Sequence, residues 1–520
     1  MTYANAITME SLAALPRDLF VFALISIHIA ALGLWAGDRL RFQGHSLWAQ
    51  WAVNGALGFS LFGVQIFVFG YLHLWNRPAF LASGLLCAGL LFTLRPPSRY
   101  PLRRLSAPLE ALYRSNRLLT SVCGLLLLAL AYASIKPPTE IDEREGHWAA
   151  PLLWAQTGHW VYSPFRQTNG PSFSQLFYLP SAVFGSSTSA HWTHLLCFVL
   201  LACACAALAK RIGGSSIAAV TAAFACPVFA MQACVSYSDL SAAMLCVGAY
   251  VALFCARPDE EERPLSSVHI LTVGLLLAAS FSAKPFTIVA FIAAANYVFV
   301  RAGIGREPAP MAFKIRSVAL LALPVWIVGL VWVAHTYSLI GKISDSNAAY
   351  IVKSPADPRY RTGTEVGRIP TPKELLTVPF IPFFTPIIGQ GEPYGGRTGL
   401  LLVPFGLLGW FSLRRLTEEQ QRLAKRMTAS AFAYLLLLGL ISVKTRYHCF
   451  VWALLIPLIS VGYAQWTRDR RYSQSILFAF YLLAFLSMAD WLRVIARGIM
   501  PHRHSGAAQI QPAAPQTLQK

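Results

Sequence analysis

The densest group of residues able to do acid–base chemistry lies directly after an apolar segment. Residues 141–148 read Ile-Asp-Glu-Arg-Glu-Gly-His-Trp, and they follow the apolar run 118–135 and a Pro-Pro pair. A carboxyl group at the end of such a run is partly desolvated, which raises its pKa and its ability to take a proton from a hydroxyl. We predict Asp142 as a general base, with Glu143 as its alternative. A solvated acidic turn that caps the next helix is the simpler interpretation.

Two further charged residues interrupt apolar surroundings. Asp239 lies in Val-Ser-Tyr-Ser-Asp-Leu, and Lys284 lies in Phe-Ser-Ala-Lys-Pro-Phe, each between two apolar runs. The simple interpretations are an Asp that favours a helix start and a Lys that extends its ammonium group to water. In the functional interpretation, Asp239 faces the same cavity as Asp142, and Lys284 is a cation for a phosphate-bearing lipid. A lone Lys in so apolar a setting needs a partner or water.

Histidine and cysteine patterns bear on metal binding. His191 and His194 are three residues apart and would share one helix face, a spacing that allows a metal pair. Interfacial His and Trp are common without metal, so we predict no metal ligands. The ten cysteines form no CxxC pair and lie almost entirely in apolar runs, as packing residues do. The sequence has no nucleotide-binding motif and calls for no organic cofactor, which leaves a divalent cation as the one cofactor still open.

The composition indicates a membrane protein. Of 520 residues, 56% are hydrophobic and only 13% are charged, whereas soluble domains carry about 25% charged residues. This excludes a soluble enzyme, a disordered chain and a fibrous repeat. The 43 Lys and Arg against 23 Asp and Glu give a net charge of +20. We attribute this surplus to cytoplasmic loops rather than to nucleic-acid binding, because such loops accumulate Lys and Arg.

Apolar runs predict an all-α polytopic membrane protein with about 13–14 transmembrane helices. The predicted spans are 18–36, 52–72, 79–94, 118–135, 191–209, 215–231, 239–256, 268–282, 285–301, 317–337, 398–413, 427–443, 448–466 and 474–492. The basic segments 95–117, 301–316, 414–426 and 468–471 fall on one side, which is therefore predicted to be cytoplasmic. Fourteen spans place Arg493, Arg497 and Arg503 on the other side, against this trend. Two long connections, 136–190 and 338–397, then fall on the outer face, and connections of this length are usually functional.

The same topology places a few basic residues on the outer face, against the general trend. Arg446 lies in Ser-Val-Lys-Thr-Arg-Tyr-His, a short turn between two spans, and Arg144 lies in the first long connection. The chain divides into extra N-terminal helices with a basic loop (1–117), a core (118–466), and a C-terminal helix followed by a tail that we expect to be disordered (467–520).

The order of these motifs resembles the GT-C superfamily of polytopic membrane glycosyltransferases, especially bacterial members related to the protein O-mannosyltransferases and the aminoarabinose transferases. The matching features are Asp142-Glu143 with His147, Tyr237-Ser238-Asp239, the small-residue run that ends at Lys284, and Arg446-Tyr447. The resemblance covers about 118–466. Residues 1–94 have no counterpart in the simplest layout of the family, and the lysine motif is an altered form.

The resemblance implies a specific activity. Such enzymes transfer a sugar from a polyprenyl-phosphate donor to an acceptor hydroxyl, with inversion, on the outer face of the membrane. Partners would be this donor, a lipid, glycan or protein acceptor, and membrane lipids, with no nucleic acid. The expected location is the bacterial inner membrane, with the active site on the periplasmic face. The implied roles are catalysis for Asp142, Glu143 and Asp239, phosphate binding for Lys284, Arg446 and Arg144, and a sugar or acceptor pocket for His147, Trp148 and Tyr237.

Two other functions remain open. A lipid or polysaccharide transporter without chemistry would carry charged residues along a central path, and the predicted spans are nearly free of charge. A protein like the O-antigen ligases or polymerases would have one dominant late outer loop with Arg and His, but 338–397 contains no His. The sugar and the acceptor are not readable from the sequence.

Overall fold

A computed structural model gives the arrangement of the chain. It describes residues 9–40, 42, 44–94, 107–138, 143–163, 169–255, 265–301, 310–341, 398–439, 448–469 and 471–499. Throughout these ranges the protein is all-α, with no β-strand. Asp142, Arg446, most of the second long connection and the C-terminal tail lie outside the described residues.

Every predicted span overlaps one or two helices. The helices are α1 (Met9–Ala13), α2 (Leu15–Arg39), α3 (Leu47–Tyr71), α4 (Arg77–Thr93), α6 (Ala107–Ser115), α7 (Arg117–Ala133), α8 (Ala149–Thr157), α9 (Phe173–Leu176), α10 (Leu179–Val183), α11 (Ser187–Arg211), α12 (Ser216–Phe224), α13 (Pro227–Gln232), α14 (Asp239–Phe254), α15 (Ser267–Ala283), α16 (Ile288–Arg301), α17 (Met311–Ile340), α20 (Leu402–Ser412), α21 (Glu418–Gly439), α22 (Cys449–Thr467) and α23 (Ser473–Ile499). A π-helical turn, η1 (Glu143–His147), precedes α8, and the short 3-10 turns η3 (Pro285–Thr287) and η7 (Leu413–Arg415) precede α16 and follow α20.

The predicted span 215–231 is divided into two helices. The chain leaves the helical path at Ala225–Cys226, and Pro227 starts α13. Proline has no backbone N–H to continue the preceding helix and is well suited to the first turn of a new one. An apolar run does not reveal such a break by its hydropathy, because both halves are equally apolar.

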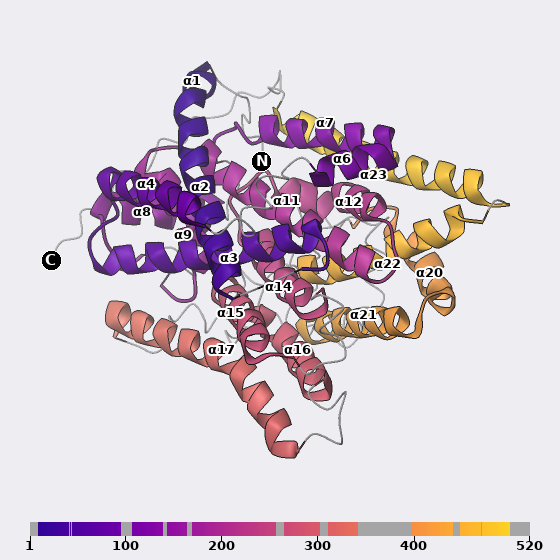
Figure 1. Ribbon diagram of the computed structural model, residues 1–520. Helices are drawn as coiled ribbons and strands as arrows, with labels where there is room; N and C mark the ends of the chain where they lie inside the picture. The colour runs from indigo at the N-terminus through magenta and orange to yellow at the C-terminus, as the bar shows by residue number, and fades with distance from the viewer. Residues whose placement is uncertain are drawn as a thin grey trace, which may run out of the picture.

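Six of the described helices, α2, α3, α11, α17, α22 and α23, are long and apolar enough to cross a membrane. Shorter apolar helices, among them α4, α7, α14 and α15, accompany them. At the edge of the molecule (Figure 1), α4 and α17 carry exposed apolar side chains such as Leu85 at 76% and Trp326 at 71%. Apolar faces of this size are stable against lipid and unfavourable in water. The protein is an all-α polytopic membrane protein.

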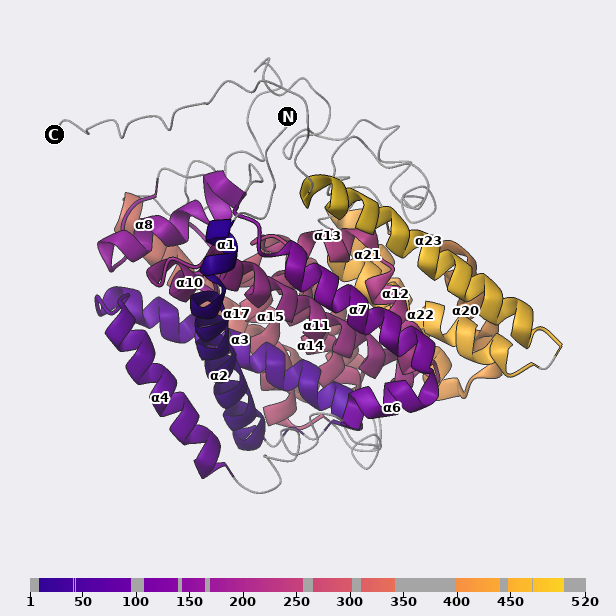
Figure 2. The same cartoon turned by 90° about the horizontal axis from the view of Figure 1, so that it is seen from above.

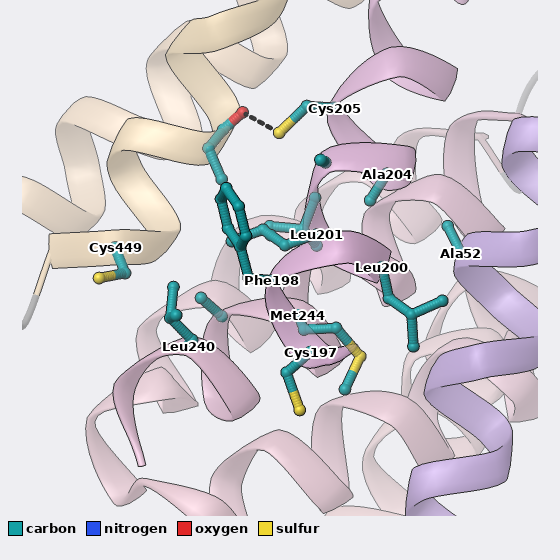
Figure 3. Packing of buried hydrophobic residues seen from close by; sticks show 14 of the residues in the cluster. Ala52, Cys197, Phe198, Leu200, Leu201, Ala204, Cys205, Leu240, Met244 and Cys449 are labelled. Carbon is teal, nitrogen blue, oxygen red and sulfur yellow. Dashed lines mark hydrogen bonds between the residues drawn. The ribbon is translucent and has the colours of Figure 1, made fainter. Parts of the chain in front are cut away.

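The centre of the molecule consists of α11, α14 and α22, with the other helices around them (Figure 1). Every residue of α14 is buried. Figure 3 shows Phe198, Leu201 and Met244 packed between these helices, and the Cys205 thiol directed at the Ala453 carbonyl oxygen, 3.5 Å away. All ten cysteines are free thiols, nine of them buried and Cys203 partly so, which fits their predicted role as packing residues.

Close helix crossings are made by paired glycines. In the α2–α3 crossing, a Cβ on Gly33 would lie 2.0 Å from the Asn54 carbonyl oxygen, and one on Gly58 would lie 2.1 Å from the Ile29 carbonyl oxygen. In the α20–α22 crossing, a Cβ on Gly409 would likewise lie 2.0 Å from a carbonyl oxygen of the partner helix. Small residues of this kind allow membrane helices to approach closely enough for van der Waals packing to hold them.

Contacts between helix ends define two ends of the molecule. At one end, the start of α11 lies against the end of α7 and against η1. At the other end, Arg211 closes α11 by donating to the Phe254 carbonyl oxygen of α14, and it pairs with Glu419 of α21. Figure 2 shows α8 and α13 toward the first end and α6 toward the second. The first connection, Asp239 and Lys284 therefore lie at the same end.

Candidate active site

Glu143 occupies the centre of a buried polar cluster. It begins η1, and its side chain is 0% exposed. Its Oε1 atom accepts hydrogen bonds from Nε2 of His191 at 2.6 Å, from the backbone N–H of Ser236 at 2.9 Å and from the Ser236 hydroxyl at 2.6 Å. These contacts join the first long connection, the start of α11 and residues 233–238, which we call the 233–238 corner because they turn the chain from α13 into α14.

Both ring nitrogens of His191 are hydrogen-bonded. Its Nδ1 atom lies 2.8 Å from the carbonyl oxygen of Ser134, which can only accept, so Nδ1 carries a proton. Its Nε2 atom lies 2.6 Å from Oε1 of Glu143, so a second proton lies between the imidazole ring and the carboxyl group. Glu143 and His191 thus form a buried acid–imidazole pair, which is an ion pair when Nε2 holds that proton.

The same contacts keep Glu143 ionised. Burial alone would raise its pKa, because an apolar environment disfavours the charged carboxylate. The imidazolium charge and the hydrogen bonds from His191 and Ser236 outweigh burial and lower the pKa of Glu143 well below its usual value. A carboxylate in this state accepts hydrogen bonds strongly but is a weak base.

Several buried polar atoms in this region have no hydrogen-bond partner among the described residues. They are Oε2 of Glu143, Nε2 of His194, and both side-chain polar atoms of Gln232. Nδ1 of His194 donates to the carbonyl oxygens of Gln232 and Val235, so its Nε2 is the atom left open. Buried polar atoms are nearly always paired with protein or ordered water. Such a concentration of open atoms indicates a place where water or a polar ligand binds.

A second buried ion pair lies at the same end. Asp239 is the first residue of α14 and is 5% exposed, and its Oδ1 atom pairs with the ammonium group of Lys284, which is 12% exposed. Lys284 ends α15, where its backbone N–H donates to the Ser280 carbonyl oxygen. The Ser280 hydroxyl in turn donates to the Ala242 carbonyl oxygen at 2.9 Å, which fixes α15 against α14.

The remaining predicted residues of the first connection lie around these pairs. The His147 ring lies 5.4 Å from the Tyr237 ring, centroid to centroid, and 3.4 Å separates its Nδ1 from the side-chain nitrogen of Gln175. Trp148 is buried, and Arg144 is exposed. The Tyr237 carbonyl oxygen accepts a hydrogen bond from the Tyr178 hydroxyl. His147 and Tyr237 are thus brought together, at the edge of the same cluster.

Aromatic packing fixes the first connection to the transmembrane helices. The Trp160 ring lies 4.8 Å from Trp75 and from Trp154, and 4.2 Å from His335 near the end of α17. The His335 Nδ1 atom also bonds the Tyr71 hydroxyl at the end of α3, at 2.7 Å. The segment that carries Glu143 is therefore anchored by α8 against both α3 and α17.

The metal pair considered for His191 and His194 is not formed, because the two rings bond different groups. Within the described ranges, no group of three or more His, Cys, Asp or Glu side chains is arranged to hold a metal ion. Ser236, Ser134 and Gln232 carry no signal in the sequence that would single them out. A histidine in an apolar helix such as His191 needs hydrogen-bond partners, and an acid is one candidate. The sequence does not indicate which acid that would be.

Comparisons with known proteins give limited information. No family model matches the chain, and no curated protein matches it. A similarity exists to the crystal structure of the Archaeoglobus fulgidus oligosaccharyltransferase in the apo form, with a TM-score of 0.36 and 14% sequence identity. The alignment covers 73% of this chain and 55% of the archaeal one, so this chain spans about half the length of that protein. A likeness at this level does not assign the protein to a family, and its activity must be argued from the site.

Proposed function

We propose that the protein is a membrane glycosyltransferase that moves a sugar from a polyprenyl-phosphate donor to an acceptor hydroxyl at the end of the helices where Glu143, Asp239 and Lys284 lie. The acceptor is a lipid, a glycan or a protein. The location that goes with this proposal is a bacterial inner membrane, with the site on the periplasmic face. A lipid-linked donor fits a site at a membrane boundary and needs no nucleotide-binding motif.

One observation carries the proposal: the buried Glu143–His191 pair and the largely buried Asp239–Lys284 pair lie at one end of the helix bundle and meet at the 233–238 corner. Ser236 bonds one pair, and Asp239, three residues on, belongs to the other. Charges at membrane depth are unfavourable and commonly mark a functional site. Helix packing alone does not require them, since α14 is packed by apolar residues along its whole length.

Each predicted residue is proposed to have a role in this reaction. The acceptor oxygen attacks the anomeric carbon, the bond from that carbon to the phosphate oxygen breaks, and the phosphate leaves with the electron pair. The proton of the acceptor hydroxyl passes to a carboxylate, for which we propose Asp142. Glu143 and Asp239 are the other acids to which we assign a catalytic role. Lys284, Arg446 and Arg144 stabilise the leaving phosphate. His147, Trp148 and Tyr237 are proposed to line the sugar or acceptor pocket.

Transfer by the purified protein tests the proposal. The protein is reconstituted into vesicles with synthetic polyprenyl-phosphate sugars and a panel of lipid and peptide acceptors, and glycosylated product is detected by mass spectrometry. We expect product with at least one donor, and none with an Asp142→Asn/Glu143→Gln/Asp239→Asn variant that folds. Movement of the donor across the bilayer without product would contradict transfer and favour a transporter.

A further inference from the structure

The Glu143 carboxylate is held by parts of the chain that are far apart in sequence. Its Oε1 atom bonds His191, 48 residues away, and Ser236, 93 residues away. His191 continues the chain of contacts to the Ser134 carbonyl oxygen at the end of α7. Three segments therefore meet at one carboxylate, and a fourth, the end of α7, is joined to it through His191. Among the described residues, the His191 ring is the one basic side chain that the structure places in direct contact with Glu143.

We propose that His191 is a positioning residue, whose imidazolium ring holds the Glu143 carboxylate, and with it the 233–238 corner that leads into Asp239, in the geometry that sugar transfer requires. This inference rests on the proposed function. It also separates the roles of the two adjacent acids. A base works best when its pKa is near the working pH. Glu143, which three hydrogen bonds hold on one oxygen, therefore serves as an anchor and hydrogen-bond acceptor, and proton transfer is left to Asp142.

The second carboxylate oxygen of Glu143, Oε2, is available to accept a hydrogen bond from a substrate hydroxyl. Oε2 is buried and has no partner among the described residues, while Oε1 is fully engaged. The ion pair therefore fixes the orientation in which Oε2 is offered to a hydroxyl. Positioning of this kind contributes strongly to rate, since misplacement by about 1 Å can lower a rate about a hundredfold.

Among the described residues, few groups are shown to act directly on Glu143, so the pH at which it ionises can be interpreted from its contacts. The group on α11 that bonds Glu143 is His191. Burial raises the pKa of the Tyr178 phenol, which precedes α10, and the negative charge of Glu143 contributes to this shift. The 233–238 corner contributes only the amide and hydroxyl of Ser236, and α7 contributes the Ser134 carbonyl oxygen through His191. His147 belongs to η1 itself. Without the His191 charge, burial would dominate and raise the pKa of Glu143.

His194 supplies a matched control. It lies three residues further along α11 and is 0% exposed, like His191, but its ring bonds only the backbone carbonyl oxygens of Gln232 and Val235. His194→Gln therefore removes a buried imidazole from the same helix without breaking an ion pair.

The experiment measures kcat/KM against pH for the parental protein, His191→Gln and His194→Gln. We expect His191→Gln to lose about a hundredfold at pH 6 and to regain much of the loss toward pH 9, since Glu143 ionises again as pH rises through its raised pKa. His194→Gln should keep the shape of the parental pH profile whatever its effect on the rate itself, because it breaks no bond to Glu143. A loss for His191→Gln that is equal at every pH, or no loss at all, overturns the positioning role.

A spectroscopic measurement keeps this inference separate from the proposed function. In His191→Gln, lowering the pH should produce the infrared carbonyl band of a buried protonated carboxyl group, and Glu143→Gln in the same background should abolish it. The double variant should also unfold at a higher temperature than either single variant, because it leaves no unpaired buried charge. A missing band or strictly additive losses of stability overturns the inference, whereas a parental protein that transfers no sugar overturns only the proposed function.

Discussion

At the scale of single residues, the site contains acids that differ in what surrounds them. Glu143 is bonded on one oxygen by three donors, and Asp239 is paired with a lysine. The hydrogen bonds to Glu143 lower its pKa well below the usual value and make it a weak base, and Asp239 would have to give up its lysine to accept a proton. This leaves Asp142 as the acid proposed for proton transfer.

Asp142→Asn should therefore lower turnover about a hundredfold or more, because it keeps the shape of the side chain and removes the proton acceptor. Donor binding should change little. The rate is measured by single-turnover transfer and donor affinity by tryptophan fluorescence, with Glu145→Gln as a matched control for loss of one acid in the same segment. An Asn variant with the parental rate would remove Asp142 from the mechanism.

Glu143→Gln should destabilise the protein strongly near neutral pH, since it leaves the His191 charge buried without a partner, a change that costs about 3–5 kcal/mol. The sign of the pH dependence follows from the lowered pKa of Glu143 in the folded state. Its stabilising effect is complete above the ordinary value of 4.5 and disappears as the pH falls through the lowered folded-state pKa.

Melting temperatures in detergent at pH 7 and at pH 4 measure this effect. The gap between the parental protein and Glu143→Gln should be smaller at pH 4. Glu110→Gln, which breaks an exposed pair with Arg114, should change stability by less than about 1 kcal/mol. A gap that widens on acidification would show that Glu143 is not held as an anion.

The Asp239–Lys284 pair allows stability and phosphate binding to be separated. Lys284→Met alone leaves Asp239 unpaired and should both destabilise the protein and weaken donor use. Lys284→Met with Asp239→Asn removes both charges and should restore stability, but donor affinity should stay low because the cation is still missing. Recovery of donor binding in the double variant would show that Lys284 serves Asp239 alone.

Arg446→Lys, which keeps a charge but loses the planar fork of the guanidinium group, should also weaken donor use.

At the scale of helices, the apolar runs predicted the elements well because a membrane helix is defined by its own sequence. The ends of α11 and α14 fall within four residues of the predicted spans. The break before Pro227 was missed, as were the short helices α9 and α10 in the first connection. The Glu143–His191 contact was missed for a different reason: its partners lie 48 residues apart, and periodicity carries no information on such pairs. The two residues of the Asp239–Lys284 pair were each identified from the sequence as an unusual charge beside an apolar run, although their contact was not predicted.

The glycine crossings yield a prediction at this scale. Gly58→Ala places a Cβ about where the Ile29 carbonyl oxygen lies, 2.1 Å away, so α2 and α3 must separate. Overpacking of this kind costs about 1–3 kcal/mol. Gly124→Ala on α7, where a Cβ meets nothing within 4 Å, is the control, and it should be neutral or stabilise the helix by about 1 kcal/mol. Thermal unfolding measures both, and equal behaviour of the two variants would contradict the close crossing.

At the scale of the whole molecule, the ion pairs between helices in the described ranges lie toward the two ends. The centre is filled with small and apolar residues, whereas one end holds the two ion pairs of the site and the other holds Arg211 with Glu419. The topology predicted from the basic segments stays a prediction. That prediction used only counts of Lys and Arg between spans, so it gave the side of each connection but none of the contacts made there.

Labelling with a membrane-impermeant maleimide tests this topology. Tyr162 follows α8 at the site end and is 56% exposed, and Glu418 begins α21 at the opposite end and is exposed. Tyr162→Cys and Glu418→Cys should react from opposite sides of sealed vesicles, Tyr162→Cys from the side on which the donor is used. Background should be low because nine of the native cysteines are buried and Cys203 is partly buried, and the parental protein measures what remains. Labelling of both positions from one side would place the two ends of α11 on the same face of the membrane, which a helix of 25 residues crossing the bilayer does not permit.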